Sequence, residues 1–226
     1  MNQIDELHPH GGDWLREIVF GLNDGLVTTL VFIMVVSGLA FTHLVLVVLG
    51  EVLAGGVSMA LGGYLSARTE KQILDHRIEI ERYEIKYEPE EERTELQEIY
   101  RNKGFSGPLL NQVVTHLTAD EERWHHALVH DELGVVEDKR INSWSQGLQV
   151  GVSFVVGGLI PAVPVLLSLP QFRWWAYGFT ALAALALGTV KARYTSTGPV
   201  RAGLEFLVVV TLGTLAGVGL GWLLHA

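Results

Sequence analysis

Five apolar stretches dominate this sequence, and each approaches the length of a helix that crosses a lipid bilayer. A spanning helix needs about 20 mostly apolar residues, because each residue adds about 1.5 Å and the hydrocarbon core is about 30 Å thick. The stretches are Ile18–Phe41, Leu44–Leu65, Trp144–Leu169, Trp174–Val190 and Ala202–Leu224. The sequence therefore predicts an all-α membrane protein with five transmembrane helices embedded in the lipid bilayer.

Residues 68–140 interrupt this pattern with a polar segment that holds 18 acidic and 11 basic residues. Pro89 favours the start of a new helix, and Thr118 with Glu121 has the spacing of a capping box. The expected helices are Arg68–Tyr87, Glu90–Asn102, Leu109–Leu117 and Ala119–Leu133. We therefore expect three parts: 1–67 with the first two spans, 68–140 as an acidic helical metal-binding insert, and 141–226 with the last three spans.

The distribution of basic residues predicts the orientation in the membrane. With a cytoplasmic N-terminus, 15 of the 16 Lys and Arg residues, all except Arg173, lie on the cytoplasmic side, as the positive-inside rule requires. Residues 1–6 lack the basic start of a signal peptide, so we expect the first apolar stretch to persist in the mature protein. The acidic balance argues against a nucleic-acid partner, and the absence of cysteine excludes thiolate metal ligands.

Two carboxylates, Asp24 and Glu51, lie inside the first and second apolar stretches. A charge near the bilayer centre costs about 2.5–3.5 kcal/mol on insertion scales, so such residues usually face a bundle interior and mark an ion or proton path. Met59 follows on the same helix face as Glu51, and its thioether would favour softer transition metals. We predict a transport path at these residues. The alternatives are carboxylates that cap backbone near the membrane surface and a methionine that only packs.

The insert carries acidic and histidine side chains at helical spacing: Glu81, Glu84, Glu88, Glu92, Glu95, Glu121, His125 and Glu132. Like charges stacked on one helix face destabilise the helix unless something compensates them. A divalent cation held by carboxylate and imidazole ligands could do so, as in carboxylate-rich bundles. Ordinary ion pairs are an equally open alternative, with Arg77, Arg82, Lys86 and Arg93 as the partners.

Small residues and prolines mark the later spans. Gly213, Gly217 and Gly221 form a close-packing face on the last span, which could serve a contact within the chain or a dimer seam. Pro161 and Pro164 in the third span predict a kink or an unwound stretch, either as simple bending or as part of the path. No nucleotide-binding motif is present, so ATP-driven pumping by this chain alone is not expected.

Three stretches resemble the vacuolar iron transporter family: residues 18–25, 50–65 and 157–164. The order of two spans, an acidic insert and three spans is also similar. The resemblance implies a homodimer with the path at the dimer interface. It further implies that Fe²⁺, or another divalent ion such as Mn²⁺, Zn²⁺ or Co²⁺, is both the substrate and the ion bound by the insert. The metal leaves the cytoplasm in exchange for protons, and no prosthetic group is implied.

The resemblance also assigns roles to residues. The family's intramembrane Asp, Glu and Met fall on Asp24, Glu51 and Met59, and its cytoplasmic metal-binding glutamates fall on Glu81, Glu84, Glu92, Glu95 and Glu132. One departure is that Leu128-Val129 stands where a methionine pair is expected, so His125 or His126 could supply the missing ligand. The compact chain suggests a bacterial relative in a prokaryotic plasma membrane, with the N-terminus and the insert in the cytoplasm.

The leading prediction is therefore a proton-coupled secondary transporter of Fe²⁺. The alternative is a membrane-anchored protein that binds or senses divalent metal without transport, although an anchor has no need of intramembrane carboxylates. A ferroxidase is a third class, but the insert lacks two clear Glu-x-x-His motifs, so we do not expect an enzyme.

Overall fold

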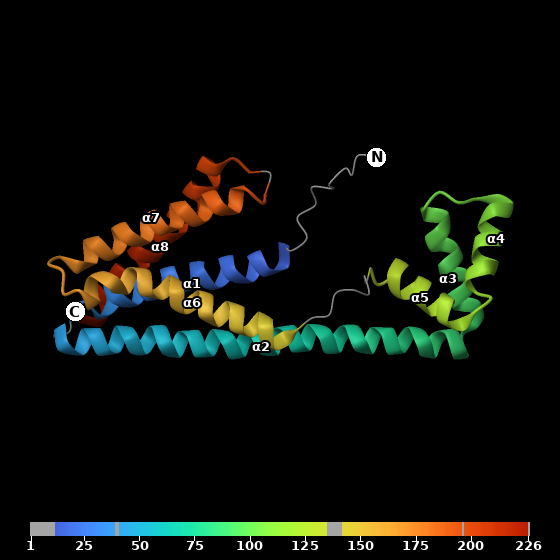
Figure 1. The fold of residues 1–226 in the computed structure, drawn as a ribbon, viewed down its shortest axis with the longest axis horizontal. Coiled ribbons are helices and arrows are strands. Elements are labelled where there is room, and N and C mark those ends of the chain that lie inside the picture. Colours follow the sequence, from blue (N-terminus) through green and yellow to red (C-terminus); the bar gives the residue numbers. More distant parts are fainter. Residues whose placement is uncertain (1–11, 39–40, 135–141, 196, 226) are drawn as a thin grey trace, which may run out of the picture. The chain divides into compact units, whose positions relative to one another are not determined.

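The computed structural model describes residues 12–38, 41–134, 142–195 and 197–225 (Figure 1). Within these ranges the chain forms eight helices and no strand, which confirms the predicted all-α class. The helices are α1 (Gly12–Val36), α2 (Phe41–Tyr87), α3 (Pro89–Asn102), α4 (Gly107–Leu117), α5 (Glu121–Asp131), α6 (Ser143–Leu166), α7 (Phe172–Ala192) and α8 (Pro199–His225). The N-terminal stretch 1–6 and the end of the predicted insert, 135–140, lie outside the described residues.

Four helices in the described part of the chain are long and apolar enough to cross a membrane: Trp14–Val36, His43–Tyr87, Ser143–Leu166 and Pro199–Leu224. The protein is therefore an integral membrane protein. Helix α7, which corresponds to the predicted fourth span, is not among the four. Its indole, phenol and small side chains lower its mean hydropathy, although it packs against α1, α6 and α8.

The chain divides into two compact units. One, which we call the bundle, comprises Met1–Ser66 with Ser143–Ala226, and the other, which we call the insert, comprises Ala67–Asn142. Helix α2 contributes to both. With 47 residues it is about 70 Å long, more than twice the thickness of the hydrocarbon core. Only part of α2 can therefore lie within a membrane.

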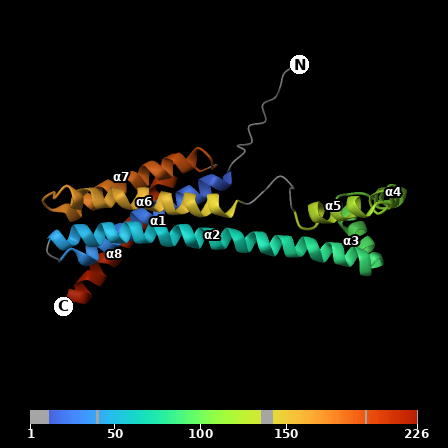
Figure 2. The ribbon, with the colours of Figure 1, turned by 60° about the horizontal axis from the view of Figure 1, so that its bottom comes forward.

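Helix α1 is the central element of the bundle. It contacts α6, α7 and α8 (Figure 2), and its apolar side chains enter two buried clusters. Leu30 and Met34 pack with α7 and α8 residues, whereas Ile33 packs with residues of α2 and α6. Large apolar side chains elsewhere on the bundle remain exposed, for example Leu53 and Val57, as expected for a surface that meets lipid.

Glycines of α8 provide a close contact with α1. A Cβ atom added at Gly217 would lie 2.9 Å from the carbonyl oxygen of Val31, and one at Gly221 would lie 3.1 Å from that of Met34. Real Cβ atoms essentially never come as close as the first distance, and the second is tighter than nine in ten real Cβ contacts. Of the two alternatives for these glycines, the structure shows the contact within the chain.

This contact predicts that Gly217→Ala destabilises the bundle. The added methyl meets backbone atoms that cannot rotate away, and overpacking of this kind costs about 1–3 kcal/mol. We expect the melting temperature of the protein in detergent to fall by about 5 °C. Gly219→Ala is the matched control, because it is the same change on the same helix and a Cβ there meets nothing within 4 Å. An equal effect of both variants would contradict the α1–α8 contact.

Helix α6 continues without a break from Ser143 to Leu166, with Pro161 and Pro164 inside it. The unwound stretch that these prolines could produce is therefore absent from this helix. Membrane helices tolerate proline where neighbouring helices satisfy the freed backbone groups. Small residues let α6 approach its neighbours closely. A Cβ at Gly158 would lie 2.7 Å from Oγ1 of Thr29 on α1.

The helices α3, α4 and α5 gather at the end of α2 (Figure 2). Together they give the insert its own hydrophobic core. Its buried cluster is Ile85, Leu96, Trp124, Ala127 and Leu128. Val129 is also buried. The Leu128-Val129 pair therefore contributes to packing, which explains how apolar residues are accommodated at these two positions.

Helix α5 begins differently from the prediction. Its N-cap is Asp120, whose Oδ1 accepts a 2.9 Å hydrogen bond from the backbone N–H of Arg123. The predicted capping box at Thr118 is wrong, because that residue ends α4 and its hydroxyl donates to the carbonyl of Val114. Aspartate is an equally good N-cap. Helix α5 therefore has its N-cap two residues later than predicted, because the α4–α5 turn places Asp120 rather than Thr118 at that position.

Candidate metal-binding sites in the bundle and the insert

Two carboxylates lie half-buried in the apolar bundle. Glu51 on α2 accepts a 2.8 Å hydrogen bond at Oε2 from the hydroxyl of Thr29 on α1. Asp24 on α1 accepts a longer one, 3.4 Å, from the hydroxyl of Thr28 one turn later. Among the described residues, neither carboxylate forms an ion pair with a basic side chain. Carboxylates that are held in an apolar bundle without a cationic partner can accept a proton or a metal ion.

Met59 lies half-buried on α2, two turns beyond Glu51. At about 1.5 Å per residue the two positions are about 12 Å apart along the helix. The three residues predicted for the transport path therefore occur on the adjoining helices α1 and α2 of one compact unit.

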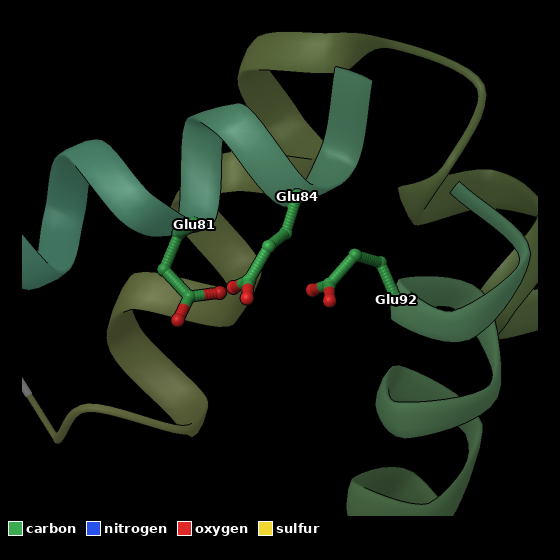
Figure 3. A group of neighbouring side chains, drawn as sticks. All are labelled: Glu81, Glu84 and Glu92. Carbon is green, nitrogen blue, oxygen red and sulfur yellow. The ribbon is translucent and has the colours of Figure 1, made fainter. Parts of the chain in front are cut away.

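A second acidic group lies in the insert, where Glu81 and Glu84 of α2 and Glu92 of α3 point toward one another (Figure 3). One carboxylate oxygen from each lies within 4.8 Å of the others. The chain turns sharply at Glu88, the single residue between the two helices, and Pro89 opens α3. This sharp junction brings residues of two helices together, and we call these three side chains the glutamate cluster.

The glutamate cluster is buried and incompletely bonded. Glu81 and Glu92 are each only 5% exposed, and Oε2 of each has no hydrogen-bond partner in the described part of the protein. The nearby Arg82 instead contacts Glu122 at 3.7 Å. A buried polar atom without a partner is costly, and three adjacent carboxylates repel one another. A bound divalent cation would remove both penalties, since carboxylate oxygens are ligands that such cations prefer.

Burial, the largest cause, and the negative charges of Glu132, Glu92, Glu84 and Glu95 together raise the pKa of Glu81 to about 8. Burial also raises the pKa of Glu92 to about 7, again with a contribution from its acidic neighbours. Both groups therefore titrate near neutral pH. Without a cation the glutamate cluster holds protons, and binding of a cation must release them.

The other predicted ligands of the insert lie outside the glutamate cluster. Glu132 is the C-cap of α5 and is exposed, and its negative charge contributes to the raised pKa of Glu81. Glu95 is exposed one turn after Glu92. The buried His125 places Nε2 3.1 Å from the carbonyl oxygen of Ile78. That nitrogen must donate to the carbonyl, so only Nδ1 of His125 could coordinate a metal.

The sequence alone did not identify the side chains that contact and position acidic residues in the insert and in the bundle. Asp131, next to Glu132, contacts Lys103, His130 and Tyr100. Burial raises the pKa of Asp131, but hydrogen bonds from these partners outweigh it and lower the pKa. The resulting links tie the C-terminus of α5 to the end of α3. In the bundle, Thr29 was likewise missed, because a threonine in an apolar stretch carries no distinctive signal.

Sequence comparison relates this chain to a family of known proteins. The family model described as the VIT family matches residues 15–222. Vacuolar iron transporter 1 of Tulipa gesneriana is 28% identical over 96% of this chain and 89% of its own length. Vacuolar iron transporter 1 of Oryza sativa subsp. japonica is 29% identical over 95% and 87% of the two chains, and that of Arabidopsis thaliana is 27% identical over 93% and 86%. The protein therefore belongs to the VIT family.

Proposed function

We propose that this protein is a proton-coupled secondary transporter that moves Fe²⁺ out of the cytoplasm, with Mn²⁺, Zn²⁺ and Co²⁺ as further candidate substrates. The observation that carries the proposal is the pair Asp24 and Glu51, two carboxylates in an apolar bundle without basic partners. Several relatives are named as iron transporters. Because the family is one of transporters, we do not propose an enzyme.

In the proposed mechanism, Asp24, Glu51 and Met59 form the path through the bundle. A carboxyl group in an apolar setting is most stable when its charge is neutralised, either by a proton or by a cation. Arrival of a metal therefore displaces protons, and departure of the metal lets protons return. This alternation links the flow of metal in one direction to the flow of protons in the other. The thioether of Met59 adds a preference for transition metals over Mg²⁺ or Ca²⁺.

The glutamate cluster is the proposed capture site for the same metal. Its two unpartnered buried oxygens and its three converging carboxylates fit a divalent cation. Glu132 and Glu95 are close enough to join when a cation draws the carboxylates together. His125 could join this set only through Nδ1, because its Nε2 donates to the carbonyl of Ile78.

The proposal includes five spans, with α7 in the membrane. The N-terminus and residues 68–140 then lie in the cytoplasm of a prokaryote, and the protein works in the plasma membrane as a homodimer. The basic residues support the orientation, since Lys191, Arg193 and Arg201 all lie in or beside the α7–α8 link. The packing of α7 against three other bundle helices supports its place in the membrane.

Thiol labelling tests directly whether α7 spans the membrane, because the chain contains no cysteine and each introduced thiol is unique. We expect Pro170→Cys, before α7, to react with an impermeant maleimide added outside intact cells. Gly198→Cys, after α7, is expected to react only once the cells are opened. Labelling of both positions from the same side would show that α7 does not cross the membrane.

The alternative function is a membrane-anchored protein that binds or senses metal without moving it. The compact insert, with its own core and its own acidic cluster, favours this alternative. Fe²⁺ uptake into proteoliposomes that contain the full chain separates the two. We expect uptake well above that of protein-free liposomes, and a stronger response with a pH gradient. Binding of Fe²⁺ to the reconstituted protein without any uptake would favour the anchored sensor.

A further inference from the structure

Thr29 differs from other buried and half-buried threonines of the bundle in the partner of its hydroxyl. Thr180, Thr211 and Thr214 each donate to the carbonyl of the residue four positions earlier on the same helix, at 2.7–2.8 Å. This local bond is the usual choice for a threonine inside a helix. Thr29 instead donates across to α2, where Oε2 of Glu51 lies 2.8 Å away. Its hydroxyl therefore forms a hydrogen bond between two helices, to one of the two carboxylates of the bundle.

The surroundings of Thr29 hold its hydroxyl in this direction. The residue is 0% exposed, so no solvent competes for the hydrogen bond. Gly158 of α6 leaves the space that the hydroxyl occupies, since a Cβ there would lie 2.7 Å from Oγ1 of Thr29. The same Cβ would lie 3.2 and 3.4 Å from the two methyl groups of Val52 on α2. The hydroxyl thus lies where α1, α2 and α6 meet.

A single hydroxyl group can orient a carboxylate and still leave it able to bind an ion. It has one proton to donate, so it occupies one oxygen of Glu51 and leaves the second oxygen available. A basic side chain in its place would neutralise the charge and repel a cation. A glutamate without any partner would instead have to be ordered each time that a metal arrives, which weakens binding.

We propose that Thr29 is a positioning residue for transport, which orients the carboxylate of Glu51 toward the metal through the hydrogen bond between α1 and α2. The inference rests on the proposed function, in which Glu51 belongs to the transport path. It adds a residue that does not itself bind metal and whose contribution depends only on its hydroxyl group.

The test compares Thr29→Val with Thr29→Ser in the full chain, reconstituted in proteoliposomes, by Fe²⁺ uptake under reducing conditions. Valine has the shape of threonine but no hydroxyl, and hydrogen bonds to charged groups are among the stronger ones, so we expect KM for Fe²⁺ to rise about tenfold. Serine restores the hydroxyl and is expected to bring KM within about twofold of the wild-type value. Thr180→Val is the matched control, since Thr180 is also 0% exposed but bonds only within α7.

The outcomes separate this inference from the proposed function. Glu51→Gln, measured beside these variants, loses uptake if Glu51 lies in the path. Normal uptake in Glu51→Gln would overturn the proposed function and this inference with it. Lost uptake in Glu51→Gln with a wild-type KM in Thr29→Val would overturn only the inference. A defect in Thr29→Val that serine fails to rescue would also overturn it, because the residue would then matter for packing.

A second variant keeps the inference testable if Thr29→Val does not fold. Gly158→Ala retains Thr29 but adds a methyl group in the space that its hydroxyl occupies. We expect the same direction of change, a rise in KM for Fe²⁺. A wild-type KM in Gly158→Ala, together with an unchanged melting temperature, would contradict the proposed role of the hydroxyl.

Discussion

Glu51→Gln is expected to lower Fe²⁺ uptake by about 100-fold or more, since loss of even an outer-shell partner of a metal ligand costs about 10–100-fold. Glutamine has nearly the same size and keeps an oxygen that can accept the hydrogen bond from Thr29. The fold of the bundle should therefore survive. What is lost is the negative charge, and with it the capacity to hold either a proton or a cation. Asp24→Asn is expected to have an effect of similar size for the same reason.

Glu205→Gln is the control for these changes. Glu205 also lies in an apolar helix, α8, but it is partly exposed and contacts Lys191 at 3.6 Å and Arg201 at 3.5 Å. We expect its loss to leave uptake close to wild type, because a partly exposed ion pair contributes little. Uptake at the wild-type rate by folded Glu51→Gln would remove Glu51 from the path.

The second large effect concerns pH and the glutamate cluster. The pKa values of Glu81 and Glu92 are raised to about 8 and about 7, so both carboxyls hold protons at pH 6 and have lost most of them at pH 9. Only the deprotonated form binds a cation. Metal affinity of the insert is therefore expected to rise steeply from pH 6 to pH 9, by about tenfold per pH unit for each proton displaced. Calorimetric titration of the full chain with Mn²⁺ at several pH values measures this.

The double variant Glu81→Gln with Glu92→Gln is expected to lose both the affinity and its dependence on pH over this range. Glu98→Gln is the control, since Glu98 is an exposed glutamate of α3 outside the cluster. A background with both Asp24→Asn and Glu51→Gln removes the contribution of the bundle carboxylates to the titration. Binding by the double variant with wild-type affinity and pH dependence would show that metal is held elsewhere.

The same pKa values fix the sign of the pH dependence of stability. The native metal-free insert retains protons on Glu81 and Glu92 that the unfolded chain loses near pH 4.5. The native state thus binds more protons between these values, so stability falls as pH rises toward 8. The protection of α3 amides against hydrogen exchange, relative to the intrinsic exchange rate at each pH, should fall over this range, and added metal should restore it.

The carboxylates of the bundle could be predicted from sequence because their apolar context is local. Asp24 and Glu51 are conspicuous within their own stretches, whatever the helices pack against. Thr29 could not be predicted, since its partner is 22 residues away in the chain and only the packing of α1 against α2 reveals the bond. The role of Gly158 depends in turn on α6, which is still more distant in sequence.

The glutamate cluster was partly predictable. Helical spacing places Glu81 and Glu84 on one face, and Pro89 indicates a new helix. The direction in which α3 leaves Glu88 is set by the packing of Leu96 against α5, which no local pattern contains. For the same reason the sequence could not show that Glu95 and Glu132 remain exposed or that His125 is turned toward Ile78.

The measurement that tests the central claim most directly follows metal and protons together. Proteoliposomes with a trapped pH indicator receive Fe²⁺ outside, with no initial pH gradient. We predict that metal entry makes the interior more alkaline as protons leave, and that Glu51→Gln abolishes both changes. Metal entry at the wild-type rate with no change in internal pH would contradict exchange of metal for protons on the carboxylates of the bundle.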